Sequence, residues 1–311
     1  MQIIRHIIQH APLPHPVVSL GNFDGVHLGH QAIMRRLVQE AQARQGTALT
    51  LTFHPHPFAV LRPNQPFALI LGLREKLETL AALGVQGVLL QRFTLPFSLL
   101  TPEEFVQRYL VKAIGAEKVI VGHNVSFGHK RTGRAETLER LGKTYGFAVE
   151  IVGPVMVDER EVSSTTVRAL LNAGEMREVA RLLGRLYAVS GRVEKGFQRG
   201  RGIGFPTANL RPRADLLLPN GVYAVVVDAG KMQIPGVANV GTNPTFGGSK
   251  RTIEAHLFDF SADLYGQRLR VGFVERLRGE RKFPSVPELV CQIQEDANRA
   301  RALLAPSPQH S

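Results

Sequence analysis

Short apolar runs alternate with segments of helical periodicity through the first half of the chain. The apolar runs, which predict strands, are residues 17–20, 48–53, 87–90, 118–121 and 148–152. The helical segments between them lie near residues 29–45, 72–83, 102–114 and 133–145. Apolar strands that alternate with helices are typical of a parallel sheet covered on both faces. We therefore expect an α/β unit whose ligand site lies beyond the carboxyl ends of its strands.

The hydrophobic pattern changes near residue 184. Two predicted helices, at about 165–173 and 175–183, precede the change. Short strands broken by Gly and Pro follow it, at residues 187–193, 222–227, 236–240, 252–260 and 269–273. This pattern predicts an antiparallel barrel or sandwich, followed by an amphipathic helix over 286–304. The expected domains are residues 1–183 and 184–305, and the expected disordered tail is 306–311.

Composition narrows the class of protein. The chain has 311 residues, of which 44% are hydrophobic, enough for two globular cores. No apolar run reaches about 18 residues, and the N-terminus lacks a signal-peptide pattern. A cytoplasmic protein that does not contact membranes is therefore expected. The single cysteine, Cys291, excludes an internal disulfide framework and a cysteine-ligated zinc site.

The net charge of +12 indicates anionic partners or a solvated arginine-rich surface. The basic residues are dispersed, Trp is absent, and no basic tract is interleaved with aromatic residues. Dispersed charge favours phosphate-binding pockets over a long nucleic-acid groove. No specific nucleic-acid partner is therefore expected, and an oligomer stays open.

The loop Gly21–His30 carries the first candidate chemistry. It lies between an apolar strand and a predicted helix, and it places His27 and His30 three residues apart. The N-terminus of a helix directs backbone N–H groups and a positive dipole end at an anion. Two imidazoles beside a phosphate can donate hydrogen bonds as negative charge develops on it. The pattern indicates a nucleotide site, although the glycines could serve the turn alone.

Three further stretches of the first half could converge on that site. Residues 52–57 contain His56 and two prolines that should end the strand, so a stiff turn is the alternative. Residues 122–128 contain Asn124, whose amide suits a base or a ribose. Residues 162–168 begin a predicted helix with hydroxyl groups and Arg168, which suit phosphate or simply cap the helix.

The second half contains a glycine-rich basic stretch, residues 191–210. Its backbone N–H groups and cations could close around phosphate, although a basic hairpin without a ligand fits equally. Thr207 and Asn209 share one face of an extended segment and offer oxygen atoms that suit Mg²⁺. Glu254 alternates with apolar neighbours, as does His256. A carboxylate there could take a proton from a substrate hydroxyl, or could simply face solvent.

The stretches GNFDGVHLGH, TFHPHP, VGHNVSFG and VSSTTVR resemble the adenylyltransferase module of bacterial bifunctional riboflavin kinase/FAD synthetases. The resemblance implies an N-terminal Rossmann-like nucleotidyltransferase sheet, in which FMN attacks the α-phosphate of ATP and expels pyrophosphate. It makes His27 and His30 catalytic. The nucleotide- and flavin-binding residues that it implies are Asn22, Asp24, Gly29, His56, Asn124, Arg160, Ser163, Ser164, Thr165 and Arg168.

The stretches GFPTANL, PNGVYAV, GVANVGTNPTF and IEAHLFDF, with LRGERKFPSVPEL, resemble the riboflavin kinase module of the same family. The resemblance implies a C-terminal antiparallel β-barrel that phosphorylates riboflavin from ATP. It makes Glu254 the catalytic base and Thr207 and Asn209 the Mg²⁺ ligands. The ATP- and flavin-binding residues that it implies are Gly191, Lys195, Gly196, Arg201, Gly204, Pro206, Arg278 and Phe283.

The resemblance covers roughly residues 15–300 and implies ATP, riboflavin, FMN and FAD as substrates or products. Two alternatives stay open. One is a nucleotidyltransferase for another phosphorylated substrate, with a second half that only binds ligand. The other is a basic binding protein without enzymatic activity. A binding protein would not need Glu254, Thr207, Asn209, His27 and His30 together.

Overall fold

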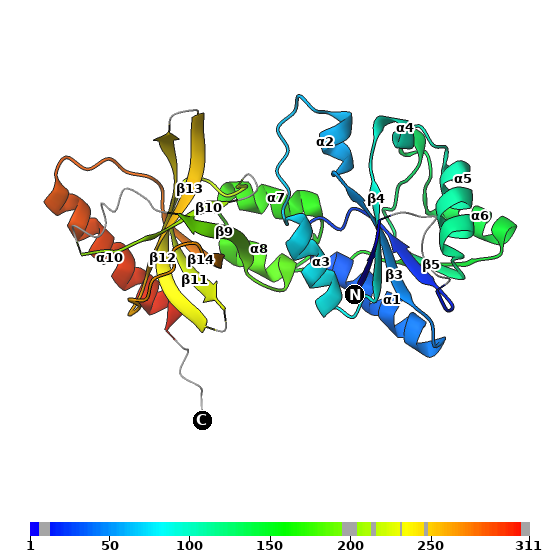
Figure 1. The fold of residues 1–311 in the computed structure, drawn as a ribbon, viewed down its shortest axis with the longest axis horizontal. Coiled ribbons are helices and arrows are strands. Elements are labelled where there is room, and N and C mark those ends of the chain that lie inside the picture. The colour runs from blue at the N-terminus through cyan, green and yellow to red at the C-terminus, as the bar shows by residue number, and fades with distance from the viewer. Residues whose placement is uncertain (6–12, 195–203, 213–215, 231, 246–247, 306–311) are drawn as a thin grey trace. The chain divides into compact units, whose positions relative to one another are not determined.

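The fold consists of two compact units, Met1–Ser164 and Thr165–Ser311 (Figure 1). The computed structural model describes residues 1–5, 13–194, 204–212, 216–230, 232–245 and 248–305, without the side chains of 243–250. The break falls at the start of α7 (Ser164–Ala173), and α8 (Met176–Leu183) packs against the barrel of the second unit. The domain boundary expected between residues 183 and 184 stays a prediction, and the expected tail 306–311 lies outside the described residues.

The first unit is built on a six-stranded parallel sheet of order β1-β4-β3-β2-β5-β6. Five of these strands were predicted from apolar runs, and the sixth, the short β1, was missed. Strand β1 has only three residues, yet it pairs in parallel with β4 at the sheet edge. The strands are β1 (Gln2–Ile4), β2 (Val17–Leu20), β3 (Ala48–His54), β4 (Gly87–Arg92), β5 (Lys118–Gly122) and β6 (Ala148–Val152).

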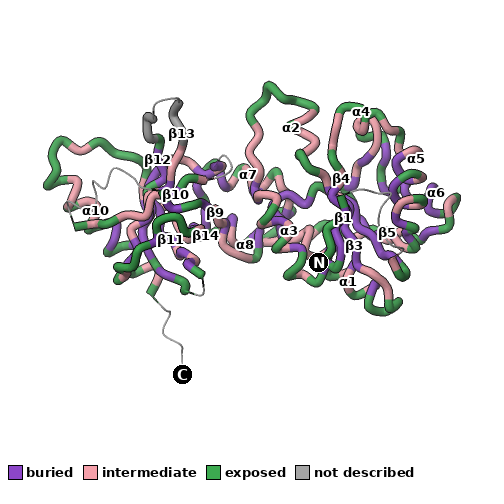
Figure 2. The backbone as a smooth tube through the Cα atoms, in the orientation of Figure 1, coloured by how far each residue is buried: buried purple, intermediate pink, exposed green. Residues whose placement is uncertain are grey.

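Helices cover both faces of this sheet, as the apolar strands predicted. Helices α1 (Leu28–Ala43) and α3 (Leu73–Ala82) pack on one face, where α1 buries Ile33, Met34 and Leu37. Helices α5 (Pro102–Phe105) and α6 (Ala135–Tyr145) pack on the other. Figure 2 shows the strands between them as buried. Because the helices cover the two faces of the sheet, loops lie at the carboxyl ends of the strands.

The helix predicted near 102–114 is more complex than expected. A capping box between Thr101 and Glu104 starts it, and after Phe105 it continues as a π-helical segment, η1 (Val106–Ile114). The prediction of a helix there is confirmed, but hydrophobic spacing does not distinguish π-helical from α-helical turns. Short elements that were not predicted complete the unit: α2 (Pro57–Leu61), α4 (Leu95–Ser98), η2 (His129–Arg131), β7 (Met156–Val157) and β8 (Arg160–Glu161).

The second unit is a closed antiparallel barrel of order β10-β13-β12-β11-β14-β9, so the barrel alternative is confirmed and the sandwich is wrong. Strand β10 was hidden in the glycine-rich stretch and closes the barrel by pairing with both β9 and β13. The strands are β9 (Tyr187–Glu194), β10 (Ala208–Pro212), β11 (Gly221–Ala229), β12 (Met232–Thr245), β13 (Gly248–Leu257) and β14 (Arg268–Arg278).

Helix α10 (Val286–Leu304) has the bounds that the sequence predicted, and it lies along the outside of the barrel against β11, β12 and β14. Ala297 and Ala300 are buried in this contact. The guanidinium of Arg301 lies 4.3 Å from the centroid of the Phe258 ring and pairs with Asp259 at 2.7 Å. These contacts hold the helix beside the barrel wall, where it borders a cavity described below. Among the described residues, no helix is both long and apolar enough to cross a bilayer.

A partly buried ion cluster in the first unit gives a pH prediction. Glu40 of α1 accepts from Arg44 at 2.7 Å and pairs with Lys118 at 3.0 Å, and these partners lower its pKa to about 2. A carboxylate with a lowered folded-state pKa contributes stability above its unfolded value, and this is lost as pH falls. We expect Glu40→Gln to flatten the loss of stability between pH 4.5 and about 2. Urea midpoints across this range measure it, and the exposed Glu139→Gln is the control; an unchanged slope in Glu40→Gln would contradict the expectation.

Candidate active sites

The loop between β2 and α1 is held by its own glycines and by Asp24. Gly25 has φ +84°, and a Cβ there would lie 2.9 Å from Ile70. The buried Asp24 carboxylate accepts from the backbone N–H groups of Ile70 and Leu71 at 3.1 and 3.3 Å. Asp24 was expected to line the nucleotide site, and the structure shows that it also anchors the segment before α3. The loop is therefore rigidly placed at the carboxyl edge of the sheet.

His27 and His30 stack against one another at the start of α1. Their ring centroids lie 3.7 Å apart, and the backbone N–H of His30 donates to Nδ1 of His27 at 3.4 Å. Because Nδ1 of His27 accepts a hydrogen bond, the proton of its neutral ring is on Nε2. No acidic residue occupies the first turn of α1, so the positive end of the helix dipole is not neutralised there. The pair is therefore placed to donate to an anion.

The pKa of His30 lies well below its usual value. Burial is the largest cause, followed by the charges of His27 and Lys76. A positive charge on this ring is thus disfavoured, and near neutral pH His30 is an uncharged hydrogen-bonding group. This is the state in which an imidazole can orient a phosphate without a permanent charge of its own.

The segment that leads into α7 approaches this loop closely. A Cβ on Gly29 would lie 3.2 Å from the carbonyl oxygen of Val162, so only glycine fits there without a shift. The hydroxyl of Ser164 donates to the carbonyl of Asp24 at 3.0 Å. The structure thus places Ser164, which follows Ser163 in the chain, against the histidine loop that contains Gly29. The roles of these three residues in nucleotide binding stay predictions.

The other predicted residues of this site are less closely placed. Asn124 is exposed just after β5, which neighbours β2, so it lies at the same sheet edge. Arg160 is exposed in the hairpin of β7 and β8. Thr165 and Arg168 belong to the second unit. The roles of these four residues in phosphate or nucleotide binding stay predictions.

An aromatic cavity of about 550 Å³ opens beside the same loop. Asn22 and His56 line it, and His56 stacks on Phe67 at 4.5 Å while its Nδ1 caps α2. The sequence did not predict this cavity, because its walls come from four separate segments. Six phenylalanines line it, namely Phe53, Phe58, Phe93, Phe97, Phe105 and Phe127. Their number in a chain with few aromatic residues is the signal that was missed.

The candidate site of the second unit lies on the outer face of the barrel wall. Ile253 and Ala255 of β13 point into the barrel and are fully buried, whereas Glu254 and His256 point outward. Asn209 of β10 pairs directly with Glu254, so the two side chains share this outer face. The adjacent segment is pinned by His256, whose Nδ1 lies 2.9 Å from the carbonyl oxygen of Pro206.

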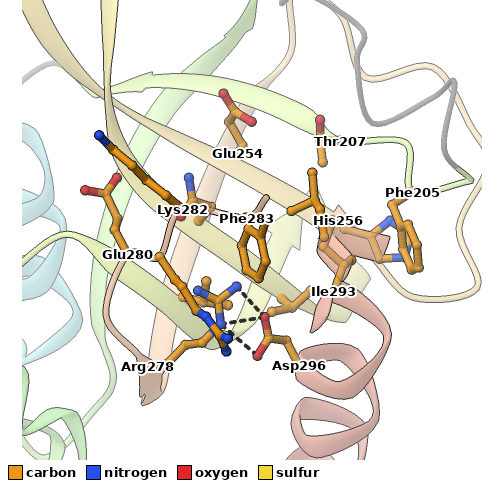
Figure 3. A pocket seen from close by; sticks show the side chains of 15 residues that line it. Phe205, Thr207, Glu254, His256, Arg278, Glu280, Lys282, Phe283, Ile293 and Asp296 are labelled. Carbon is orange, nitrogen blue, oxygen red and sulfur yellow. Dashed lines mark hydrogen bonds and ion pairs between the residues drawn. The ribbon is translucent and has the colours of Figure 1, made fainter. Parts of the chain in front are cut away.

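A cavity of about 670 Å³ lies between this wall and α10 (Figure 3). Thr207 and Glu254 line it, together with Arg278 and Phe283, and their roles in catalysis and binding stay predictions. Arg278 forms an ion pair with the buried Asp296 of α10 at 2.8 Å, and its guanidinium lies 5.7 Å from the centroid of the Phe283 ring. The cavity is therefore lined by an aromatic ring, a carboxylate and a fixed cation.

A second cavity, of about 680 Å³, adjoins the first at Thr207. Pro206 and Asn209 line it, and Thr207 lines both cavities. The amide nitrogen of Asn209 is 3.5 Å from the carbonyl oxygen of Thr207, which leaves the amide oxygen outside that contact. Two ligands bound in these cavities would thus meet at Thr207, next to Glu254.

The remaining predicted residues of the kinase site divide into two groups. Gly191 lies in β9, where a Cβ would be 2.8 Å from the carbonyl oxygen of Arg211, so the strand contact itself requires glycine. Gly204 is exposed and has φ +88°. Lys195, Gly196 and Arg201 lie outside the described residues. Their roles in binding ATP stay predictions.

Comparison with known proteins matches each half of the chain to a separate family model. A family model described as FAD synthetase matches residues 10–166, and one described as riboflavin kinase matches residues 183–304. The chain is 38% identical over 304 residues to an Escherichia coli K12 protein named bifunctional riboflavin kinase/FMN adenylyltransferase, covering 97% of each chain. It is 40% identical over 292 residues to a protein of the same name from Pseudomonas fluorescens, covering 94% of each.

A crystal structure described as a macrolide-efflux protein from Streptococcus pneumoniae has the same architecture. Its TM-score is 0.87 at 35% sequence identity, and the match covers 96% of this chain and 98% of that one. Both halves of the fold and both family models thus match in order along almost the whole chain. The chain belongs to the family of bifunctional riboflavin kinases/FMN adenylyltransferases.

Proposed function

We propose that the chain makes FAD from riboflavin in two ATP-consuming steps at two separate sites. The second unit phosphorylates riboflavin to FMN, and the first unit adenylylates FMN to FAD with release of pyrophosphate. The observation that carries the proposal is the presence of two candidate sites in one chain, one in each unit. One has the stacked His27 and His30 at a helix N-terminus, and the other has Glu254 in the first of two cavities that share Thr207.

In the kinase step, riboflavin occupies the cavity beside α10, and ATP occupies the cavity on the other side of Thr207. The isoalloxazine ring packs against Phe283, and Glu254 accepts the proton of the 5′-hydroxyl as its oxygen attacks the γ-phosphorus. The P–O bond to the leaving ADP breaks in the same transfer. Because Glu254 and Asn209 are paired across β10 and β13, the base and the proposed Mg²⁺ ligand stay in register.

Mg²⁺ fits the oxygen atoms available at this point. Thr207 and Asn209 offer a hydroxyl and an amide oxygen, hard donors that suit Mg²⁺ when phosphate oxygens and water complete its shell. When bound, the ion would neutralise charge on the transferred phosphoryl group. In the described part of the chain, no cluster of three or more His, Cys, Asp or Glu side chains is placed to hold a metal without a substrate.

In the adenylyl-transfer step, a phosphate oxygen of FMN attacks the α-phosphorus of ATP, and pyrophosphate leaves. Such a transfer needs positioning and charge stabilisation more than a strong nucleophile, because FMN supplies the nucleophile itself. His27 and His30 donate hydrogen bonds to the transferred phosphate, and the start of α1 adds its dipole. The aromatic cavity beside Asn22 and His56 holds the flavin ring by stacking.

The substrates under this proposal are small molecules, and the basic surface serves their phosphates rather than a specific nucleic acid. The enzyme works in the cytoplasm, and the proposal holds for a monomer or an oligomer. Incubation with riboflavin, ATP and Mg²⁺, followed by separation of the flavins, tests the whole proposal. FAD supports both steps, FMN alone leaves the first unit without its activity, and neither product rejects the proposal.

The ion pair under Phe283 gives a separate prediction. Asp296 is 6% exposed, so Asp296→Asn would leave Arg278 without its buried counter-charge. Loss of one partner of a buried pair destabilises by about 3 kcal/mol. We expect a lower melting temperature and a higher KM for riboflavin, with adenylylation of added FMN retained. Asp228→Asn, on β11 and partly exposed, is the matched control, and an unchanged KM in Asp296→Asn would contradict this role of the pair.

A further inference from the structure

Lys76 of α3 is a buried lysine that the sequence analysis did not single out. Its side chain is 7% exposed. The ammonium donates to the carbonyl oxygen of Asn22 at 3.0 Å and to the hydroxyl of Thr52 at 3.1 Å. The Thr52 hydroxyl also donates to the Asn22 carbonyl at 3.3 Å. These three contacts close a triangle between α3, the carboxyl end of β3 and the start of the histidine loop.

Charged and titratable groups face Lys76 from several elements. Asp24, in the loop after β2, favours its charged form. Lys76 in turn disfavours a charge on His30 of α1 and on His54 of β3. Burial outweighs Asp24 and lowers the pKa of Lys76 to about 8, so the ammonium is still mostly charged near neutral pH. Two further groups belong to this set. His27 disfavours a charge on His30, and Arg5 disfavours a charge on His54.

The position is unfavourable for stability alone. The Lys76 ammonium has been removed from water, and two neutral acceptors with the charge of Asp24 recover only part of the lost solvation. An apolar side chain of similar length would not lose this solvation. Yet the group sits directly behind the loop that carries Asn22, which lines the aromatic cavity, and the histidines, which begin α1. Lys76 therefore sets the spacing between Asn22 and the two histidines.

We propose that Lys76 is a positioning residue for adenylyl transfer, which holds the Asn22 backbone at the end of β3 and places a positive charge behind His30. This inference rests on the proposed function of the first unit. Asn22 then stays at the flavin cavity while the histidines stay at the phosphates. Together with burial and His27, which are the larger causes, the positive charge of Lys76 disfavours a charge on His30.

The test compares Lys76→Met with two matched variants in the full-length chain. We expect Lys76→Met to lower kcat for FAD formation from FMN by roughly 10- to 100-fold, because a displacement of about 1 Å has effects of this size. Riboflavin phosphorylation by the same molecules should stay unchanged, which also reports that the chain is folded. Lys118→Met removes a lysine that is 12% exposed, and Lys143→Met removes an exposed one. Both should keep the FAD-forming rate.

Two further measurements separate positioning from a merely structural role. The NMR titration of the His30 ring should move to higher pH in Lys76→Met and stay in place in Lys118→Met. In the wild-type chain, FAD formation should fall as pH rises through about 8, where Lys76 loses its proton, while FMN formation should not fall in the same way. The second measurement needs no variant, so it holds even if Lys76→Met does not fold.

The inference is overturned if Lys76→Met forms FAD at the wild-type rate, or if wild-type FAD formation shows no decline near pH 8. It is also overturned if His30 titrates at the same pH in both proteins. A wild-type chain that makes no FAD from FMN would instead refute the proposed function of the first unit. The two failures are therefore distinguishable.

Discussion

Glu254→Gln is expected to stop FMN formation while leaving the conversion of added FMN to FAD intact. Glutamine keeps the size and shape of the side chain but cannot accept the proton of the riboflavin hydroxyl. Loss of a general base lowers rates by about 10²- to 10⁴-fold. Glu254 points out of the barrel wall into the cavity beside α10, so the substitution leaves the barrel interior untouched. Initial rates with riboflavin and with FMN, each with Mg·ATP, measure the effect.

The exposed Glu295→Gln on α10 is the control for the removal of a carboxylate, and both of its activities should match the wild type. Equal loss of both activities in a folded Glu254→Gln protein would argue against separate sites. Undiminished FMN formation would remove Glu254 from the mechanism, and the base would then have to come from another group.

His30→Ala is expected to give the opposite pattern, in which FMN accumulates and FAD formation falls. Removal of one preorganised donor to a developing charge slows a reaction by about 10²- to 10³-fold. The loss should appear in kcat more than in KM, because the hydrogen bond strengthens as charge builds on the transferred phosphate. Separation of the flavins during turnover of riboflavin measures the FMN that accumulates.

His15→Ala, an exposed histidine paired with Glu117 at 2.8 Å, is the control for this experiment. It should produce FAD at the wild-type rate. If His30→Ala also made FAD without a decrease, the stacked pair would have no part in adenylyl transfer, and the phosphate would have to be held by other groups.

Much of the first unit could be predicted from local patterns. Apolar runs predicted β2, β3, β4, β5 and β6, and their parallel arrangement followed from the helices between them. The loop with His27 and His30 could be placed at the carboxyl edge, because it follows a strand and precedes a helix. These features depend on residues that are close in the chain, so a short window of sequence contains the necessary information.

The strands that were missed depend on distant partners. β1 is only three residues long and forms because β4 offers a free edge to it. β10 lies in a stretch whose glycines favour a loop, and it becomes a strand because β9 and β13 pair with it on both sides. Tertiary pairing thus overrode local preference in both places.

The sequence by itself determined the two-domain organisation in outline, the α/β character of the first unit and the main candidate groups for both reactions. Only the tertiary structure revealed the aromatic cavity beside Asn22, the shared position of Thr207 between two cavities and the buried ammonium of Lys76. The physical reason is that strand and helix preferences arise within a few residues. A cavity or a buried charge exists only once segments far apart in the chain have packed together and excluded water.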